Sequence, residues 1–317
     1  PDGPIAGASG IDERTEWSDF MHWYSGWLDE VTWRSLQAAR RQTTKPIAAM
    51  IGGPKIGLSQ GIALGNVGPV VRMLGRLRPA FFNDTDGETL FSTRYTRAAC
   101  AQYGVELMVE HVGPPFLDPY HHVNMAMNAL ACGADLIHFA HFGELFDADH
   151  WMARTWSSLL PHVAGRRPLP IRSDAAILHS FVTAWYRPER GNADAVSVYD
   201  STNTLWFAEK GYPSWGRVLG SPDVVDDTMV EDGALRARKL LVIPNASVTL
   251  TTRKAARAIA AWVRSGGTLV GFGEGCLSHV VEADRSLRRT GPMLGLLGGP
   301  SAPQAPRDGA QPVDRAV

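Results

Sequence analysis

The strongest constraint on the fold is a repeat of short apolar segments in the first half of the chain. They begin about 30 residues apart, at 46–51, 79–83, 105–110 and 135–140. Apolar residues at helical spacing lie between them, at 67–77, 92–103 and 120–132. About 30 residues is the length of one βα unit, and a closed barrel of eight such units needs roughly 250 residues. Four units therefore predict an α/β fold that contains half of a (β/α)8 TIM barrel.

A long amphipathic helix over 17–42 precedes the first of these units. After residue 151 the spacing changes, with a helix over 151–162 and a strand over 175–178. The segment 238–273 then reads as strand, crossover helix over 251–265 and second strand, which is one βαβ unit of a small doubly wound, flavodoxin-like sheet. The predicted organisation is a barrel half at 1–165, a second α/β domain at 166–297, and a disordered tail at 298–317 that is rich in Gly, Pro and Ala.

Charge and composition exclude several classes of partner. The 317 residues carry 31 Lys and Arg against 32 Asp and Glu, a net charge of −1. Such a balance supplies no broad cationic field, so we expect neither a nucleic acid nor a membrane partner. No run of about 18 apolar residues suggests a membrane span. The first ten residues lack the regions of a signal peptide, which favours a cytoplasmic protein over a secreted one. Because the chain opens without Met in a Gly/Pro stretch, we expect that a natural N-terminal part precedes it.

The three cysteines, Cys100, Cys132 and Cys276, form no C-x-x-C pair. Reduced, buried thiols are therefore expected instead of disulfides or a structural zinc site. Cys276 follows Gly-Glu-Gly after a strand, somewhat like a nucleophile elbow, but it lacks the tight Gly-x-Cys-x-Gly turn. It is expected to be inert.

Glu110 is the sharpest candidate for a catalytic residue. In parallel α/β sheets, function collects at the carboxyl ends of the strands. Glu110 ends the apolar alternation Leu107-Met108-Val109 with a carboxylate. A carboxylate held there by a rigid sheet can attack a sugar's anomeric carbon or stabilise the oxocarbenium-like charge that forms on it. The alternative is a salt-bridged or solvated glutamate at a strand end.

Other polar residues lie near the same predicted strand ends and are candidates for binding sugar hydroxyls. They are Asp84, Asp86, His111, His138, His141 and Glu144. The two aspartates could instead bind a cation or cap the following helix. No histidine pattern matches a zinc motif, and the Gly-rich stretch 271–275 does not match a dinucleotide fingerprint, so neither a metal nor a cofactor is expected.

Ten tryptophans are present, and an indole face matches the C–H face of a pyranose. Some of them could therefore form sugar-stacking platforms. The helical spacing of Trp23 and Trp27, however, predicts that these two side chains lie mostly in the core.

The order of these parts resembles the family 42 glycoside hydrolases, the β-galactosidase-like enzymes, and related clan A glycosidases. In them a (β/α)8 barrel is followed by an amidotransferase-like trimerisation domain. Leu107-Met108-Val109-Glu110-His111 looks like the end of the seventh barrel strand, and 133–139 (Gly-Ala-Asp-Leu-Ile-His-Phe) looks like the eighth. The helix after Asp19-Phe20 looks like the one that follows the fourth strand, and 240–273 resembles the core of the trimerisation domain.

The resemblance implies a retaining β-glycosidase that acts on an oligo- or polysaccharide, with Glu110 as nucleophile and a homo-oligomer, a trimer, as the assembly. The family's general acid/base is a Glu, usually preceded by Asn, at the end of the fourth strand. The sequence contains no Asn-Glu pair, so the chain is expected to be catalytically incomplete as given. Two alternatives stay open: a carbohydrate-binding protein without catalysis, and an amidotransferase-like hydrolase that uses Cys276.

Overall fold

A computed structural model describes residues 16–51, 67–84, 90–111, 126–127, 129–139, 147, 149–163, 173–180, 182, 222–243, 250–271 and 277–289. These residues form two parallel sheets, with helices between and around them, and one small mixed sheet. The predicted α/β class is therefore confirmed. None of the described helices combines the length and the apolar composition that a membrane span requires.

The first sheet contains the four predicted strands in sequential order, all parallel. Its strands are β1 (Ile47–Ile51), β2 (Ala80–Asp84), β3 (Glu106–His111) and β4 (Leu136–Phe139). The helices of this half are α1 (Glu16–Gln42), α2 (Val67–Arg76), α3 (Leu90–Tyr103) and α6 (Trp151–Val163). Each predicted strand lies within one residue of its expected start, because a short apolar segment bounded by polar or turn residues marks a strand in the local sequence.

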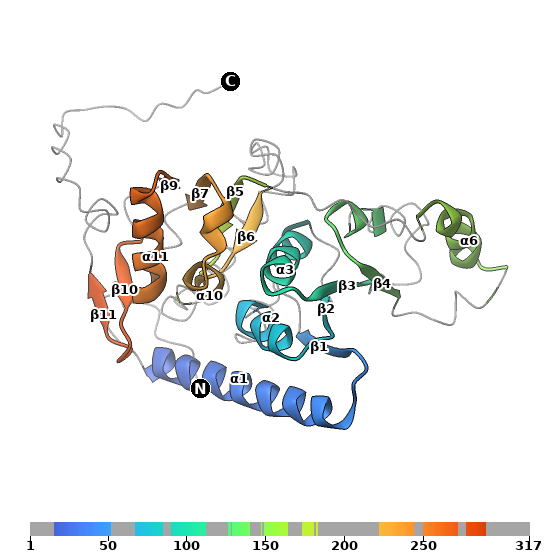
Figure 1. Ribbon diagram of the computed structural model, residues 1–317, viewed down its shortest axis with the longest axis horizontal. Coiled ribbons are helices and arrows are strands. Elements are labelled where there is room, and N and C mark those ends of the chain that lie inside the picture. Colours follow the sequence, from blue (N-terminus) through green and yellow to red (C-terminus); the bar gives the residue numbers. More distant parts are fainter. Residues whose placement is uncertain are drawn as a thin grey trace, which may run out of the picture.

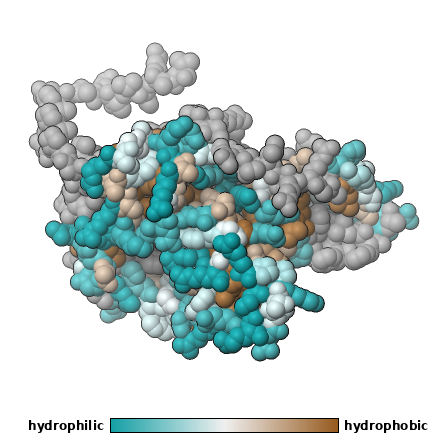
Figure 2. Space-filling view, in the orientation of Figure 1, coloured by the Kyte–Doolittle hydropathy of each residue, from teal (hydrophilic) through white to brown (hydrophobic). Residues whose placement is uncertain are grey.

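The two faces of the first sheet have different surroundings. Side chains that point toward α2 and α3 belong to the main apolar core, among them Phe82, Leu107 and Val109, all fully buried. Residues one position away in each strand point to the opposite face, because side chains alternate along a strand. On that face Met50 is 62% exposed and Leu136 is 43% exposed. Figure 2 shows apolar groups reaching the surface beside this sheet, on a face that is otherwise mostly hydrophilic.

The second parallel sheet has the strand order β6-β5-β7-β9. Its strands are β5 (Ala175–Leu178), β6 (Asp223–Val225), β7 (Leu240–Ile243) and β9 (Thr268–Gly271). The helices are α10 (Asp227–Glu231), the 3-10 helix η3 (Ala234–Ala237) and α11 (Arg253–Arg264). The predicted βαβ unit therefore forms, with α11 as the crossover between β7 and a neighbouring parallel strand.

A small third sheet was not predicted. It consists of β8 (Leu250–Thr252), β10 (His279–Val281) and β11 (Leu287–Arg289), with β8 parallel and β11 antiparallel to β10. Thr251 was expected to begin the crossover helix but lies in β8, and the helix starts two residues later. Thr252 accepts a hydrogen bond on Oγ1 from the backbone N–H of Ala255 at 3.0 Å, which is a helix N-cap. Strands of three residues are hard to predict because distant pairing stabilises them.

The prediction that Trp23 and Trp27 lie in the core is wrong. Their side chains are 58% and 50% exposed. Helix α1 instead buries a narrow stripe that includes Met21 and Leu36, and it packs on α2 and β1 along that stripe. Spacing alone identified one aromatic face of the helix, but it did not reveal which face meets the rest of the molecule.

The two parallel sheets are joined through helices. In Figure 1, α2 and α3 lie between the first sheet and the strands β5 and β6, and α3 contacts β6 directly. One apolar cluster is continuous across this joint, from Phe82 in the first sheet to Leu241 in the second. Where the boundary between two domains falls, expected at 165/166, stays a prediction. The expected tail at 298–317 lies outside the described residues.

Polar groups are also buried at the joint. Arg94 on α3, fully buried, donates a hydrogen bond from Nη2 to Asp223 Oδ1 at 2.6 Å. The carboxylate of Asp226, the N-cap of α10, accepts hydrogen bonds from the Gly68 N–H at 2.8 Å and from Tyr95 Oη at 2.6 Å. A β-carbon on Gly68 would come within 2.4 Å of that carboxylate, so the close approach requires glycine.

Cys100 and Cys132 are buried, as expected, and neither forms a disulfide bond. Cys276 lies outside the described residues, so its environment stays a prediction.

Candidate active site

The candidate active site lies at the carboxyl end of the first sheet, where β3 presents Glu110. Leu107 and Val109 of the same strand are fully buried in the core against the helices. The alternation of side chains therefore turns Glu110 to the opposite face. Its side chain is 14% exposed, so the carboxylate is largely shielded and still reachable. Since β3 pairs with β2 on one side and β4 on the other, the carboxylate has neighbours from both strands.

Asn83, the penultimate residue of β2, holds the Glu110 carboxylate. Asn83 Nδ2 donates a hydrogen bond to Glu110 Oε2 at 2.7 Å, and the Asn83 residue is only 4% exposed. The same amide nitrogen lies 3.4 Å from Met50 Sδ, on the neighbouring strand β1. A hydrogen bond to a charged acceptor in a shielded position is stronger than one between neutral groups.

His138 approaches the same carboxylate oxygen from β4. It is the direct register partner of Glu110, and its Nδ1 lies 3.8 Å from Glu110 Oε2. This separation is too long for a hydrogen bond, but it lies within the distance limit of an ion pair. The side chain is 32% exposed, so His138 also faces the space in front of the sheet.

The structure brings together two of the predicted site residues, Glu110 and His138. Asp84 and His111 are the last residues of β2 and β3, and their backbones pair with Val109 and Phe139 respectively. The roles predicted for their side chains remain predictions. Asp86, His141 and Glu144 lie outside the described residues, and so does Cys276 of the alternative hydrolase.

Asn83 was missed as a site residue, although the sequence carried a signal for it. Phe82 is fully buried in the core, so strand alternation turns Asn83 toward the face that Glu110 occupies. The same alternation places both residues on one face of the sheet, and the register between β2 and β3 then brings them together. Sequence reasoning instead selected the acidic residues that follow, because a carboxylate suggests chemistry more readily than an amide does.

The arrangement supports carboxylate chemistry. Among the described residues, no group of three or more His, Cys, Asp or Glu side chains could hold a metal ion. A rigid strand fixes the Glu110 backbone, and Asn83 Nδ2 and His138 Nδ1 both lie on the side of Oε2. A carboxylate oriented in this way can act as a nucleophile or stabilise a neighbouring positive charge.

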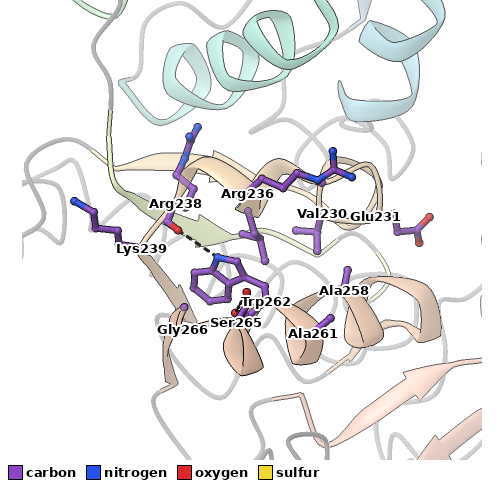
Figure 3. A pocket seen from close by; sticks show the side chains of 13 residues that line it. Val230, Glu231, Arg236, Arg238, Lys239, Ala258, Ala261, Trp262, Ser265 and Gly266 are labelled. Atoms are coloured by element: carbon purple, nitrogen blue, oxygen red, sulfur yellow. Dashed lines mark hydrogen bonds between the residues drawn. The ribbon is translucent and has the colours of Figure 1, made fainter.

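A cavity of about 580 Å³ in the second unit is a less suitable site (Figure 3). It lies beside α10, η3 and the end of α11, and residues just before β7 and β9 also line it, so it is at the amino ends of those strands. Two of its three clustered cations are engaged elsewhere: Arg238 pairs with Asp223, and Lys239 pairs with Asp174. Trp262 Nε1 donates to the Arg238 carbonyl at 3.2 Å, which fixes the indole as part of the wall.

Asp226 and Asp227 are neighbouring carboxylates that are buried in the second unit, and structural contacts occupy both. Burial raises the pKa of Asp226, opposed by the hydrogen bonds from Tyr95, Met229 and Gly68. Burial likewise raises the pKa of Asp227 to about 7, opposed by the hydroxyls of Thr251 and Ser180. The Ser180 hydroxyl donates to Asp227 Oδ2 at 2.7 Å. Asp227 is therefore a buried group that titrates near neutral pH, away from Glu110.

No protein-family model matches the chain, and no curated protein is significantly similar to it in sequence. Solved structures that resemble its fold include two β-galactosidases. One is the polyextremophilic β-galactosidase of the Antarctic haloarchaeon Halorubrum lacusprofundi, with 11% identity and a TM-score of 0.53 over 86% of this chain. The other is the β-galactosidase of the psychrophilic Marinomonas ef1, with 14% identity and a TM-score of 0.55 over 91% of this chain.

The chain spans less than half the length of each of these β-galactosidases, 44% of the first and 49% of the second. At such low identity the likeness is one of fold. The chain thus has a β-galactosidase-like fold over most of its length, and membership of family 42 specifically stays a prediction.

Proposed function

We propose that this chain is part of a retaining β-glycosidase in which Glu110 is the catalytic nucleophile. The observation that carries the proposal is the place of Glu110. It is a shielded carboxylate at the carboxyl end of a middle strand of a parallel sheet, oriented by Asn83 at 2.7 Å. The fold likeness to two β-galactosidases supports a carbohydrate substrate with a β-glycosidic bond.

In this proposal the first sheet is half of a (β/α)8 barrel. Its sequential strand order and its parallel pairing are what a barrel requires. The exposed Met50 and Leu136 side chains would then face the barrel interior. The second unit would be an amidotransferase-like domain that takes no part in catalysis. Its parallel β6-β5-β7-β9 sheet is compatible with such a domain.

The proposed mechanism has two steps. Glu110 attacks the anomeric carbon as the aglycone leaves, and water then hydrolyses the glycosyl-enzyme ester. A retaining enzyme needs a second carboxyl group about 5 Å from the nucleophile, first as general acid and then as base. Since the sequence holds no Asn-Glu pair, we propose that this group comes from a polypeptide segment that the sequence does not include. His138 would contact the bound sugar or the nucleophile from β4.

The test is Glu110→Gln, made in the longest reading frame that contains this chain. Hydrolysis of aryl β-glycosides should fall by at least about a thousandfold, because an amide cannot form the glycosyl ester. Glu106→Gln is the matched control. It makes the same change at the other end of β3, on the same face, and should leave the rate unchanged.

Activity of Glu110→Gln within about tenfold of the unaltered protein would exclude Glu110 as the nucleophile. Saccharide binding without any hydrolysis, in the longest reading frame, would favour the carbohydrate-binding alternative instead.

A further inference from the structure

We infer that Asn83 is the positioning residue of Glu110 and that Oε1, not Oε2, is the oxygen that attacks the sugar. The inference rests on the proposed function, since it assigns the two oxygens of the proposed nucleophile. It follows from which carboxylate oxygen the neighbouring strands contact.

The orientation of the Asn83 carboxamide follows from its contact with Glu110. Nδ2 lies 2.7 Å from Glu110 Oε2. Exchanging the amide nitrogen and oxygen would place Oδ1, which only accepts hydrogen bonds, against an ionised carboxylate. That arrangement is repulsive, so the donating orientation is the one compatible with a charged Glu110. The residue is 4% exposed, which leaves its carboxamide little access to solvent as an alternative partner.

Asn83 lowers the stability of the folded protein at this position. Among the described residues, its buried Oδ1 has no hydrogen-bond partner. Burying an amide oxygen without a partner costs stability, and an apolar side chain of similar size would avoid that cost. Its one strong contact is the charge-assisted bond to Glu110. An energetically costly residue whose strong bond goes to the proposed nucleophile is better explained by positioning than by packing.

The two oxygens of Glu110 have different environments. Both polar contacts recorded for it in the described part of the chain, Asn83 Nδ2 at 2.7 Å and His138 Nδ1 at 3.8 Å, reach Oε2. An oxygen that accepts a charge-assisted hydrogen bond has a lone pair engaged and is a weaker nucleophile. Oε1 keeps its lone pairs available. In the first step, a lone pair of Oε1 forms the bond to the anomeric carbon while the bond to the aglycone oxygen breaks, and the aglycone departs with the electron pair.

The experiment uses a substrate that does not need the general acid. A 2,4-dinitrophenyl 2-deoxy-2-fluoro-β-galactoside has a leaving group that departs as a stable anion, without a proton. The fluorine slows hydrolysis of the ester, so the glycosyl-enzyme accumulates and its rate of formation can be followed by intact mass. Peptide mapping locates the label.

The informative variant is Asn83→Asp, which keeps the shape and replaces the donor by a carboxyl group. At pH 7 the two carboxylates repel, and the rate of labelling should fall about ten- to hundredfold. The loss should shrink at lower pH, where the introduced carboxyl group is protonated and donates again. A purely structural role would lower thermal stability and would not produce this pH-dependent rate.

Gln102→Glu is the matched control. Gln102 Nε2 donates to the Met229 carbonyl at 3.0 Å, in a part-buried site on α3 away from the strand ends. The same exchange of amide for carboxyl there should cost stability and leave the labelling rate within about twofold. Equal labelling rates in Asn83→Asp and the unaltered protein, with the label on Glu110, would overturn the positioning role while leaving the nucleophile in place.

A second measurement does not depend on activity. The side-chain NH2 resonances of Asn83, identified by their loss in Asn83→Asp, should shift in Glu110→Gln, because Nδ2 then loses its charged acceptor. Glu106→Gln should leave these resonances unchanged. Asn83 resonances that stay unchanged in Glu110→Gln would overturn the inference. If the protein of the longest reading frame stayed unlabelled while the Asn83 resonances responded to Glu110→Gln, the proposed function would be excluded and the contact between Asn83 and Glu110 would stand.

Discussion

At the scale of single residues, the second unit contains buried titratable groups whose pKa values are shifted by burial, among them Asp227 and His179. Asp227 is the first residue of α10, and its carboxylate accepts hydrogen bonds from the hydroxyls of Ser180 and Thr251. Its pKa lies near 7 because burial disfavours the charged form more than the two hydroxyls favour it. His179 is also buried, and burial lowers its pKa to about 4. The two groups affect stability in opposite directions as pH changes.

The pKa difference of Asp227 between the folded and unfolded states makes stability depend on pH. Between pH 4 and pH 7 the folded protein holds a proton on Asp227 that the unfolded chain has released, so the stability it contributes is lost as pH rises. His179 acts in the opposite sense, and its contribution is lost as pH falls from 6.5 to 4. Comparing a variant of Asp227 with the unaltered protein cancels the His179 contribution.

We predict that Asp227→Asn becomes progressively more stable than the unaltered protein as pH rises from 4 to 8. The expected gain is on the order of a few kcal/mol, because three pKa units correspond to about 4 kcal/mol. Asn retains hydrogen bonding to both hydroxyls. Urea unfolding at several pH values measures the difference. A difference that stays constant across this range would mean that Asp227 is ionised throughout.

At the scale of elements, α11 shows how a local signal and a tertiary contact combine. Thr252 caps the helix by accepting from the Ala255 N–H, and its hydroxyl donates to Glu231 on α10. The residue is also the last one of β8. Thr252 is therefore the end of a strand, and its hydroxyl both caps α11 and contacts α10.

We expect Thr252→Ala to lower the free energy of unfolding by about 1–2 kcal/mol, since it leaves an N-terminal N–H of α11 without its acceptor. Thr252→Ser keeps the hydroxyl and should cost less than half as much. Guanidinium unfolding followed by circular dichroism would measure both variants. If the two variants were equally destabilised, the methyl group rather than the cap would be responsible.

The elements of the first sheet were predictable because each carries its own signal. Apolar segments such as Leu107 to Val109 predict a buried strand from local sequence alone, and their spacing predicts parallel pairing through crossover helices. The short strands β8, β10 and β11 carry no such signal, since three residues gain stability only by pairing with distant partners. The exposure of Trp23 could not be predicted for a related reason. The sequence shows the aromatic stripe of α1, but it does not show which face of the helix packs against α2 and β1.

At the scale of the whole molecule, a buried polar joint connects the two parallel sheets. Arg94 on α3 reaches Asp223 on β6, and Arg238 contacts the same carboxylate from the other side. Burial raises the pKa of Asp223, and the nearby guanidinium groups of Arg94 and Arg238 oppose that effect. Because the apolar core is continuous across the joint, the described parts of the two units should unfold together.

We predict that Arg94→Met lowers the free energy of unfolding by about 3 kcal/mol, because it removes one partner of a fully buried ion pair. Arg97→Met is the control on the same helix. It breaks the partly exposed pair with Asp135, which should be worth less than about 1 kcal/mol. Chemical unfolding followed by fluorescence and circular dichroism would measure both. Equal effects of the two variants would show that the Arg94 pair is not an important part of the joint.

The sequence by itself determined the βα spacing, the positions of the main strands and helices, and the placement of Glu110 at a strand end. These features depend on neighbours within a few residues and on apolar periodicity, so they are readable from one chain. Only the tertiary structure decided that Asn83 bonds to Glu110, that α1 exposes its aromatic stripe, and that Arg94 joins the two sheets. Each of these depends on strand register or on which surfaces pack together. Such contacts join residues that are 27 or 129 positions apart. The residues next to each partner in the sequence therefore do not reveal the contact.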